Sequence, residues 1–69
     1  MLQDYLKKYR MRHNLTQKEM ADKLRTTQDY YCQIESGKKR PGHMMISRIS
    51  TVVGVSESYI SKLVYENNK

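Results

Sequence analysis

The chain has 69 residues and carries 13 lysines and arginines against seven aspartates and glutamates, a formal net charge of +6. A chain of this length has room for one hydrophobic core, so we expect a single domain over residues 1–69. The positive charge indicates a polyanionic partner, either nucleic acid or an anionic membrane surface, unless it serves solubility alone.

Several functional classes have no support in the sequence. Cys32 is the only cysteine, so an intrachain disulfide is impossible. There is no secretory signal and no apolar run long enough to cross a bilayer, so we expect a cytoplasmic protein with no membrane partner. His13 and His43 lack neighbours at metal-ligand spacing, and no nucleophile is paired with a base. We therefore expect no metal, no cofactor, no small-molecule ligand and no enzymatic activity.

Apolar residues recur at helical spacing along the chain, and only one proline and three glycines interrupt them. This pattern predicts a compact all-helical fold with short turns. The first expected helix runs to about Arg12. Its apolar stripe, spaced i, i+3, i+4 and i+7, consists of Leu2, Tyr5, Leu6 and Tyr9.

The second expected helix has a clear start. Thr16 can cap it, Glu19 stands three residues later to complete a capping box, and Leu15 and Met20 occupy the positions of a hydrophobic staple. We expect this helix to end near Leu24.

The third expected helix follows within three residues. Thr26 or Thr27 caps it, and it ends after about nine residues at Gly37, which suits a left-handed position. Two short helices joined by so tight a turn must cross steeply, which predicts a helix-turn-helix.

Two more helices complete the expected bundle. Pro41 and Gly42 precede the fourth, which ends at Gly54 and has on its inner side Met45, Ile46, Ile49, Val52 and Val53. Ser56 caps the fifth, whose apolar residues are Tyr59, Ile60, Leu63 and Val64, with Val55 and Ile60 as a staple. The polar tail, residues 66–69, is expected to fray.

Two segments resemble the lambda repressor-like family of helix-turn-helix DNA-binding domains, which includes phage repressors and Cro-type proteins. LTQKEMADKL, residues 15–24, is similar to the first motif helix, and TTQDYYCQIESGKKRP, residues 26–41, to the recognition helix and its basic exit. The resemblance extends from about Leu6 to Ser56. It rests on the joint occurrence of Gln17, Ala21, Ile34, Glu35, Gly37 and Pro41.

The resemblance implies a five-helix bundle whose third helix enters the DNA major groove while the second crosses the backbone. It also implies a bacterial or phage-encoded, homodimeric regulator that binds a pseudo-palindromic double-stranded DNA operator and represses by occluding a promoter. A restriction-modification controller and an antitoxin are alternatives with the same fold. A protein-interaction module that has lost DNA binding is an alternative of another class.

Base readout is expected from the outward side of the third helix, which a helical wheel assigns to Asp29, Cys32, Gln33 and Ser36, with Gln28 at the leading edge. A glutamine amide can bond both N6 and N7 of adenine, and the resemblance places Gln28 and Gln33 at base-contacting positions. Solvated glutamines are the alternative.

Two of these residues have a second interpretation. Asp29 can accept from a cytosine amino group, or it can favour the helix dipole and form a capping box with Thr26. Cys32 faces the groove with the base-reading residues, and its oxidation would block that contact, which suggests a redox switch.

Contacts to the DNA backbone are expected from Gln17, Thr27, Tyr30, Ser36, Lys38, Lys39 and Arg40. Gln17 begins a helix, where free N–H groups suit a phosphate; the resemblance also allows it to brace the recognition helix. Tyr30 either lies against the sugar-phosphate backbone or packs onto the second helix. The basic triplet is otherwise a solvated charge run.

Other residues have structural interpretations. The resemblance implies that Arg10 and Glu35 pair between the first and third helices. Tyr31 replaces an aliphatic residue and needs a partner for its hydroxyl. Arg25 stands where the family usually has glycine, so a positive φ there would strain it. Gly42 and its successor make the start of the fourth helix the least defined boundary.

The last helix offers a surface for self-association. Its candidate residues are Val55, Tyr59, Leu63 and Tyr65. The same residues could instead complete the core of the monomer.

Overall fold

A computed structural model describes residues 1–65 of the protein, so the expected fraying of residues 66–69 lies outside the described part. Within it there are five helices and no strand. They are α1 (Leu2–Arg12), α2 (Gln17–Lys23), α3 (Gln28–Glu35), α4 (His43–Val53) and α5 (Glu57–Tyr65). The prediction of an all-helical bundle of five helices is confirmed.

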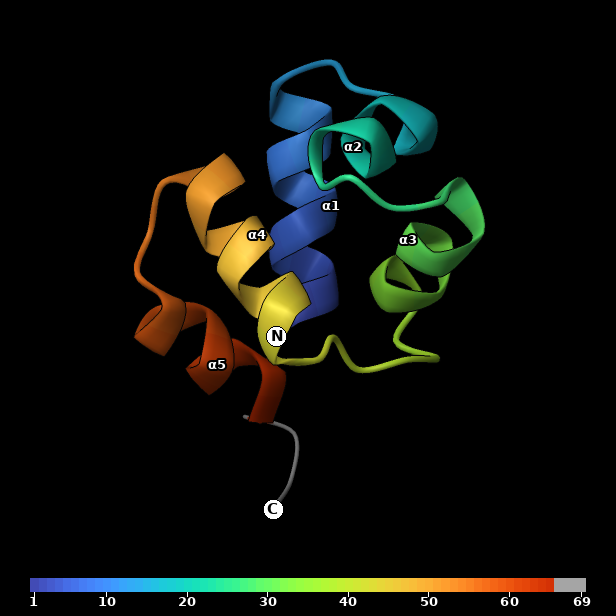
Figure 1. Ribbon diagram of the computed structural model, residues 1–69. Helices are drawn as coiled ribbons and strands as arrows, with labels where there is room; N and C mark the ends of the chain where they lie inside the picture. The colour runs from blue at the N-terminus through green and yellow to red at the C-terminus, as the bar shows by residue number, and fades with distance from the viewer. Residues whose placement is uncertain (66–69) are drawn as a thin grey trace.

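The first helix occupies the middle of the bundle (Figure 1). It packs against both α3 and α5, while α2 packs against α3 and α4 packs against α5. The helix-turn-helix pair α2–α3 therefore lies on one side of α1, and the pair α4–α5 lies on the other (Figure 1). One face of α3 is held by its neighbours, which leaves the other free for a partner.

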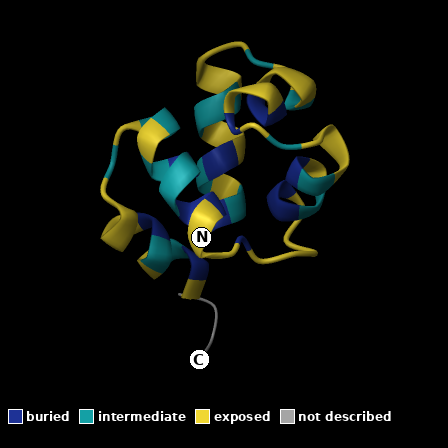
Figure 2. Ribbon diagram, in the orientation of Figure 1, coloured by how far each residue is buried: buried dark blue, intermediate teal, exposed yellow. Residues whose placement is uncertain are grey.

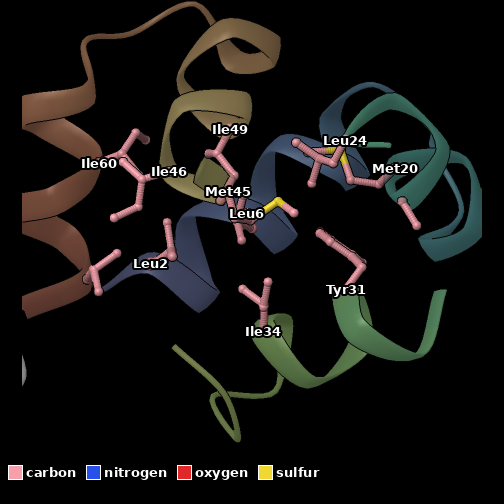
Figure 3. Close-up of a cluster of buried hydrophobic side chains, with 12 residues drawn as sticks. Leu2, Leu6, Met20, Leu24, Tyr31, Ile34, Met45, Ile46, Ile49 and Ile60 are labelled. Atoms are coloured by element: carbon pink, nitrogen blue, oxygen red, sulfur yellow. The ribbon is translucent and has the colours of Figure 1, made fainter. Parts of the chain in front are cut away.

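The apolar side chains of all five helices meet in one cluster, made of Leu2, Leu6, Met20, Ala21, Leu24, Tyr31, Ile34, Met45, Ile46, Ile49, Ile60 and Val64. Figure 3 shows Leu6 and Met45 at its centre, with Tyr31 and Ile34 reaching towards them from α3. Val52 and Val53, expected to face inward, are only partly buried at its edge. The cluster anchors α3 by its inner side.

The start of α2 is the predicted capping box. The Thr16 hydroxyl accepts from the backbone N–H of Glu19 at 3.0 Å, and the Glu19 carboxylate accepts from the N–H of Thr16 at 2.8 Å. Similarly, the Ser56 hydroxyl accepts from the N–H of Tyr59 at 3.1 Å, as its expected role as the cap of α5 requires. By contrast, Gly42 precedes α4 without any side-chain cap.

One of the two threonines expected as the cap of α3 fills that role. Thr27, not Thr26, is the N-cap, and its hydroxyl accepts from the N–H of Tyr30 at 3.2 Å. The proposed capping box between Thr26 and Asp29 is therefore absent, because the third residue after this cap is Tyr30. The helix ends at Glu35, and Gly37 takes the left-handed position just beyond it, as expected.

The helices α1, α2 and α3 all end in the same way, with one residue in the left-handed conformation. These residues are Asn14 (φ 56°), Arg25 (φ 58°) and Gly37 (φ 82°). At each end two backbone bonds close a Schellman motif; after α2 they run from Arg25 N–H to the Asp22 carbonyl and from Thr26 N–H to the Ala21 carbonyl. The positive φ considered for Arg25 is thus present.

Candidate nucleic-acid interface

The outward side of α3 is polar and largely exposed. Gln28, Asp29 and Cys32 are exposed, and Gln33 is half-buried at the edge of the same side. Figure 2 shows α3 divided between a buried side towards the bundle and an exposed side away from it. No basic residue stands in its last turn. These four side chains can therefore offer hydrogen-bonding groups and a thiol to a groove without a positive charge among them.

The chain leaving α3 is held to the helix by its backbone. Gly37 takes the left-handed position, and the N–H groups of Lys38 and Lys39 both donate to the carbonyl of Gln33, at 2.9 and 3.1 Å. The Ser36 hydroxyl donates to that same carbonyl at 3.2 Å. The two lysines are therefore presented at a set position beside the end of α3.

Aromatic rings lie under two of the exit cations. The Lys39 ammonium lies 5.9 Å from the ring centre of Tyr30, and the Arg40 guanidinium lies 5.4 Å from that of Tyr65. Tyr30 is half-buried and packs against the edge of the core, so much of its ring already has protein neighbours. A basic rim of residues 38–40, all of them exposed, follows the outward side of α3.

A buried carboxylate ties α3 to α1 and α2. Glu35 accepts two bonds from the Arg10 guanidinium, from Nε at 2.9 Å and Nη2 at 3.1 Å. It also accepts from the Tyr31 hydroxyl at 2.6 Å and from the Gln17 amide at 3.1 Å. Arg10 in turn donates to the Leu15 carbonyl at 2.9 Å. Four donors thus surround one carboxylate that lies behind the outward side of α3.

This arrangement places Gln17 in the bracing position, with its amide N–H directed at Glu35 rather than outward. The second N–H of the Gln17 amide and the first N–H groups of α2 stay available to a phosphate. The hydroxyl of Tyr31 has the partner that its burial requires, because Glu35 lies one helical turn later on the same side of α3.

The network shifts two ionisation equilibria in opposite directions. Burial raises the pKa of Glu35, but hydrogen bonds from Arg10, Tyr31 and Gln17 outweigh it, so that the pKa lies below its usual value. Burial, and then the bond to Glu35, raise the pKa of the Tyr31 hydroxyl well above its usual value. The folded protein therefore favours an ionised Glu35 and a neutral Tyr31.

These shifts predict how the stability depends on pH. A lowered Glu35 pKa contributes stability above about pH 4.3, which is lost as the pH falls through the folded pKa. A raised Tyr31 pKa contributes stability below about pH 10, which is lost as the pH rises above that value, where only the unfolded chain ionises. The free energy of unfolding should accordingly decline both at acidic and at alkaline pH.

We expect Tyr31→Phe to lower the free energy of unfolding at neutral pH by about 1.5–3 kcal/mol, the usual contribution of a hydrogen bond to a charged group. In this variant the free energy of unfolding should also decline less at alkaline pH. Urea denaturation between neutral pH and pH 11 measures both effects. Tyr65→Phe, which alters an exposed tyrosine, is the control; identical profiles for the two variants would contradict the assignment.

One contact to the turn between α2 and α3 was missed in the sequence. Arg48 of α4 donates from Nη1 to the carbonyls of Leu24 and Arg25, at 3.4 and 3.1 Å, and from Nη2 to the sulfur of Met44. It therefore covers the C-terminal end of α2. Nothing in the local sequence indicated this role, since the partners are 23 and 24 residues away.

The proposed self-association surface is partly exposed. Tyr59 and Tyr65 are 44% and 53% exposed, whereas Val55 and Leu63 are half-buried against the core. The ring of Tyr59 also packs edge-on against Tyr5, with ring centres 5.9 Å apart. The half-buried pair contributes to the monomer, and the two tyrosines leave apolar area uncovered.

Other classes of site were sought in residues 1–65. No group of three or more histidine, cysteine or acidic side chains in that part could hold a metal ion. None of its helices combines the length and apolar character needed to span a membrane.

Comparisons with known proteins agree with this geometry. The helix-turn-helix family model matches residues 6–60. The uncharacterized HTH-type transcriptional regulator YqaE of Bacillus subtilis is 39% identical over 62 residues, which are 90% of this chain and 53% of that protein. The uncharacterized HTH-type transcriptional regulator MJ0272 of Methanocaldococcus jannaschii is 34% identical over 68 residues, 99% of this chain and 100% of that protein. This chain thus spans about half the length of the Bacillus relative. No solved structure matches it significantly.

Proposed function

Because this chain belongs to the helix-turn-helix family, we propose that it is a transcriptional regulator that binds double-stranded DNA in a sequence-specific manner. The observation that carries the proposal is the separation of polar and basic side chains around α3. An uncharged or acidic polar side is followed by three basic residues, and the backbone of α3 holds the first two, Lys38 and Lys39, in place.

The two parts suit different features of DNA. Phosphate contacts supply affinity and orientation without sequence information, which fits Lys38, Lys39 and Arg40 at the end of α3. Base edges are distinguished by hydrogen bonds in the major groove, which fits the amides of Gln28 and Gln33. Asp29 would accept from a cytosine amino group. It is free to do so because Thr27 already caps the helix.

Further residues would complete the backbone contacts. Thr27, Tyr30 and Ser36 flank the outward side of α3, and Gln17 begins α2 behind it. Bracing by Glu35 fixes the side chain of Gln17, so that it would meet a phosphate without losing further freedom.

We further propose that the protein acts as a homodimer on a pseudo-palindromic operator and represses by occluding a promoter, in the manner of a Cro-type protein. The partly exposed Tyr59 and Tyr65 on α5 support a self-association surface there. Two copies related by a twofold axis would place their recognition helices about 34–36 Å apart, one turn of DNA.

Single variants at the exit of α3 test the electrostatic half of the proposal. Lys38→Gln and Lys39→Gln should each weaken binding to every duplex and reduce the slope of log affinity against log salt by about 0.9. Fluorescence anisotropy over a salt series measures this. Lys62→Gln removes the same charge from α5 and serves as the control. A protein-interaction module without DNA binding would give no such dependence, and a loss confined to one sequence would contradict the assignment.

A further inference from the structure

A second basic surface lies away from residues 38–40. It is a groove of about 260 Å³ between the end of α2 and α4, and its lining residues are Lys23, Arg25, Ser47, Arg48, Thr51 and Val52. Three of the six are cationic, two carry hydroxyls, and among residues 1–65 no carboxylate lines it. Neither Lys23 nor Arg25 forms an ion pair with another described residue.

Arg25 occupies its place in this groove at a conformational cost. It is the left-handed residue of the Schellman motif that ends α2, with φ 58°, a position that glycine fills at no such cost. Backbone strain of this kind persists mainly at sites where the residue has a function. A guanidinium at the mouth of a cationic groove is the one feature that arginine adds there.

Arg48 makes the floor of the groove suitable for an anion. The C-terminal end of a helix carries a partial negative charge that would repel one. Here Arg48 donates to the carbonyls of Leu24 and Arg25 and so neutralises that end. These bonds also hold its guanidinium in one position, which lowers the entropic cost of binding a ligand beside it.

We propose that this groove binds a phosphate-type oxyanion, with Arg25 and Lys23 as its mobile cations and Arg48 as its fixed one. Guanidinium groups match the geometry of phosphate oxygens, and an ammonium adds a point charge. The hydroxyls of Ser47 and Thr51 are further donors at the wall. The phosphate comes either from a free phosphorylated molecule or from DNA that extends beyond the base pairs contacted by α3.

The first arm of the test uses pyrophosphate as the probe. Backbone amide shifts are recorded by NMR during its addition, with chloride at equal ionic strength as the reference. We expect saturable shifts at Arg25, Arg48 and Thr51. Lys23→Gln and Arg25→Asn should each weaken binding about three- to fivefold, as the loss of one exposed charge contact predicts. Asparagine tolerates the left-handed conformation, so the turn should be retained.

Two further variants control this arm. Arg25→Gly should lose pyrophosphate affinity while its melting temperature stays equal to or above that of the wild type, because glycine relieves the strain. Lys62→Gln removes a charge from α5 and should leave the affinity unchanged. If the affinity were lost through general unfolding, the melting temperature would fall as well. An unchanged or raised melting temperature of Arg25→Gly excludes that explanation.

The second arm distinguishes the two sources of phosphate. If DNA supplies it, Arg25→Asn also lowers affinity for a duplex and reduces the salt slope by about 0.9. If a free molecule supplies it, affinity for the duplex is unchanged while that for pyrophosphate falls. The proposal is overturned if neither affinity depends on Arg25 and Lys23, or if the shifts centre on residues 38–40 instead. Neither result would contradict the proposed DNA binding by α3, because the variants of Lys38 and Lys39 test it separately.

Discussion

Glu35→Ala is expected to unfold the protein at or near room temperature. The carboxylate accepts bonds from Arg10, Tyr31 and Gln17, and its removal leaves a largely buried guanidinium without its partner. Breaking one side of a buried pair costs about 3–5 kcal/mol. At about 0.05–0.15 kcal/mol per residue, this loss is comparable with the whole stability of so small a protein.

Thermal unfolding followed by circular dichroism at neutral pH measures the effect. Glu57→Ala, which removes an exposed glutamate from the first turn of α5, is the matched control and should change the stability by less than about 1 kcal/mol. If Glu35→Ala melts close to the wild type, the carboxylate does not hold α3 to α1 and α2 in the way described.

Gln28→Ala and Gln33→Ala are expected to change which DNA the protein prefers. A bidentate contact between an amide and adenine contributes about 1–3 kcal/mol of discrimination against a wrong base. Both side chains lie on the outward side of α3, with Gln28 exposed and Gln33 half-buried at the edge. Each variant should therefore lose preference for the operator over unrelated duplexes at its own base position.

Competition between the operator and its single-base variants measures this preference. The salt slope of the glutamine variants should equal that of the wild type, since neither side chain carries charge. Lys38→Gln is the opposite case, because it should lower affinity for all duplexes and keep the preference. If the glutamine variants weakened binding to all duplexes equally and kept the operator preference, Gln28 and Gln33 would contact the DNA backbone rather than the bases.

Local chemistry in the sequence predicted much of the fold. The Thr16–Glu19 capping box involves residues three apart, so its signature could be read directly, and the structure contains it. The choice between Thr26 and Thr27 could not be made in this way. Both are competent caps, and the decision follows from the end of α2, where the N–H of Thr26 is already bonded to the Ala21 carbonyl. Thr27 is the next residue able to cap.

Contacts between distant residues were predictable only in part. Arg10 and Glu35 were paired by resemblance to a family, whereas the addition of Tyr31 and Gln17 to the same carboxylate required the packed structure. Arg48 had no local signature, because its role depends on the distance between α4 and the turn after α2. The basic groove at that turn was not foreseen for the same reason.

The residues in the left-handed conformation also differ in how far the sequence predicted them. Gly37 was predicted at the end of α3, because glycine enters this conformation freely, and Arg25 was considered only because the family usually has glycine there. Asn14 was overlooked, although asparagine is among the residues that adopt it most readily. An asparagine two residues before the capping Thr16 was the signal.

Selection of binding sites from random duplex DNA tests the central claim most directly. The account predicts a recovered palindrome whose two half-sites are centred about one helical turn apart, 10–10.5 base pairs. The Gln28 and Gln33 variants should then recover altered half-sites, while the Lys38 variant should recover the same half-site more weakly. Absence of any enriched sequence at every salt concentration would contradict the account.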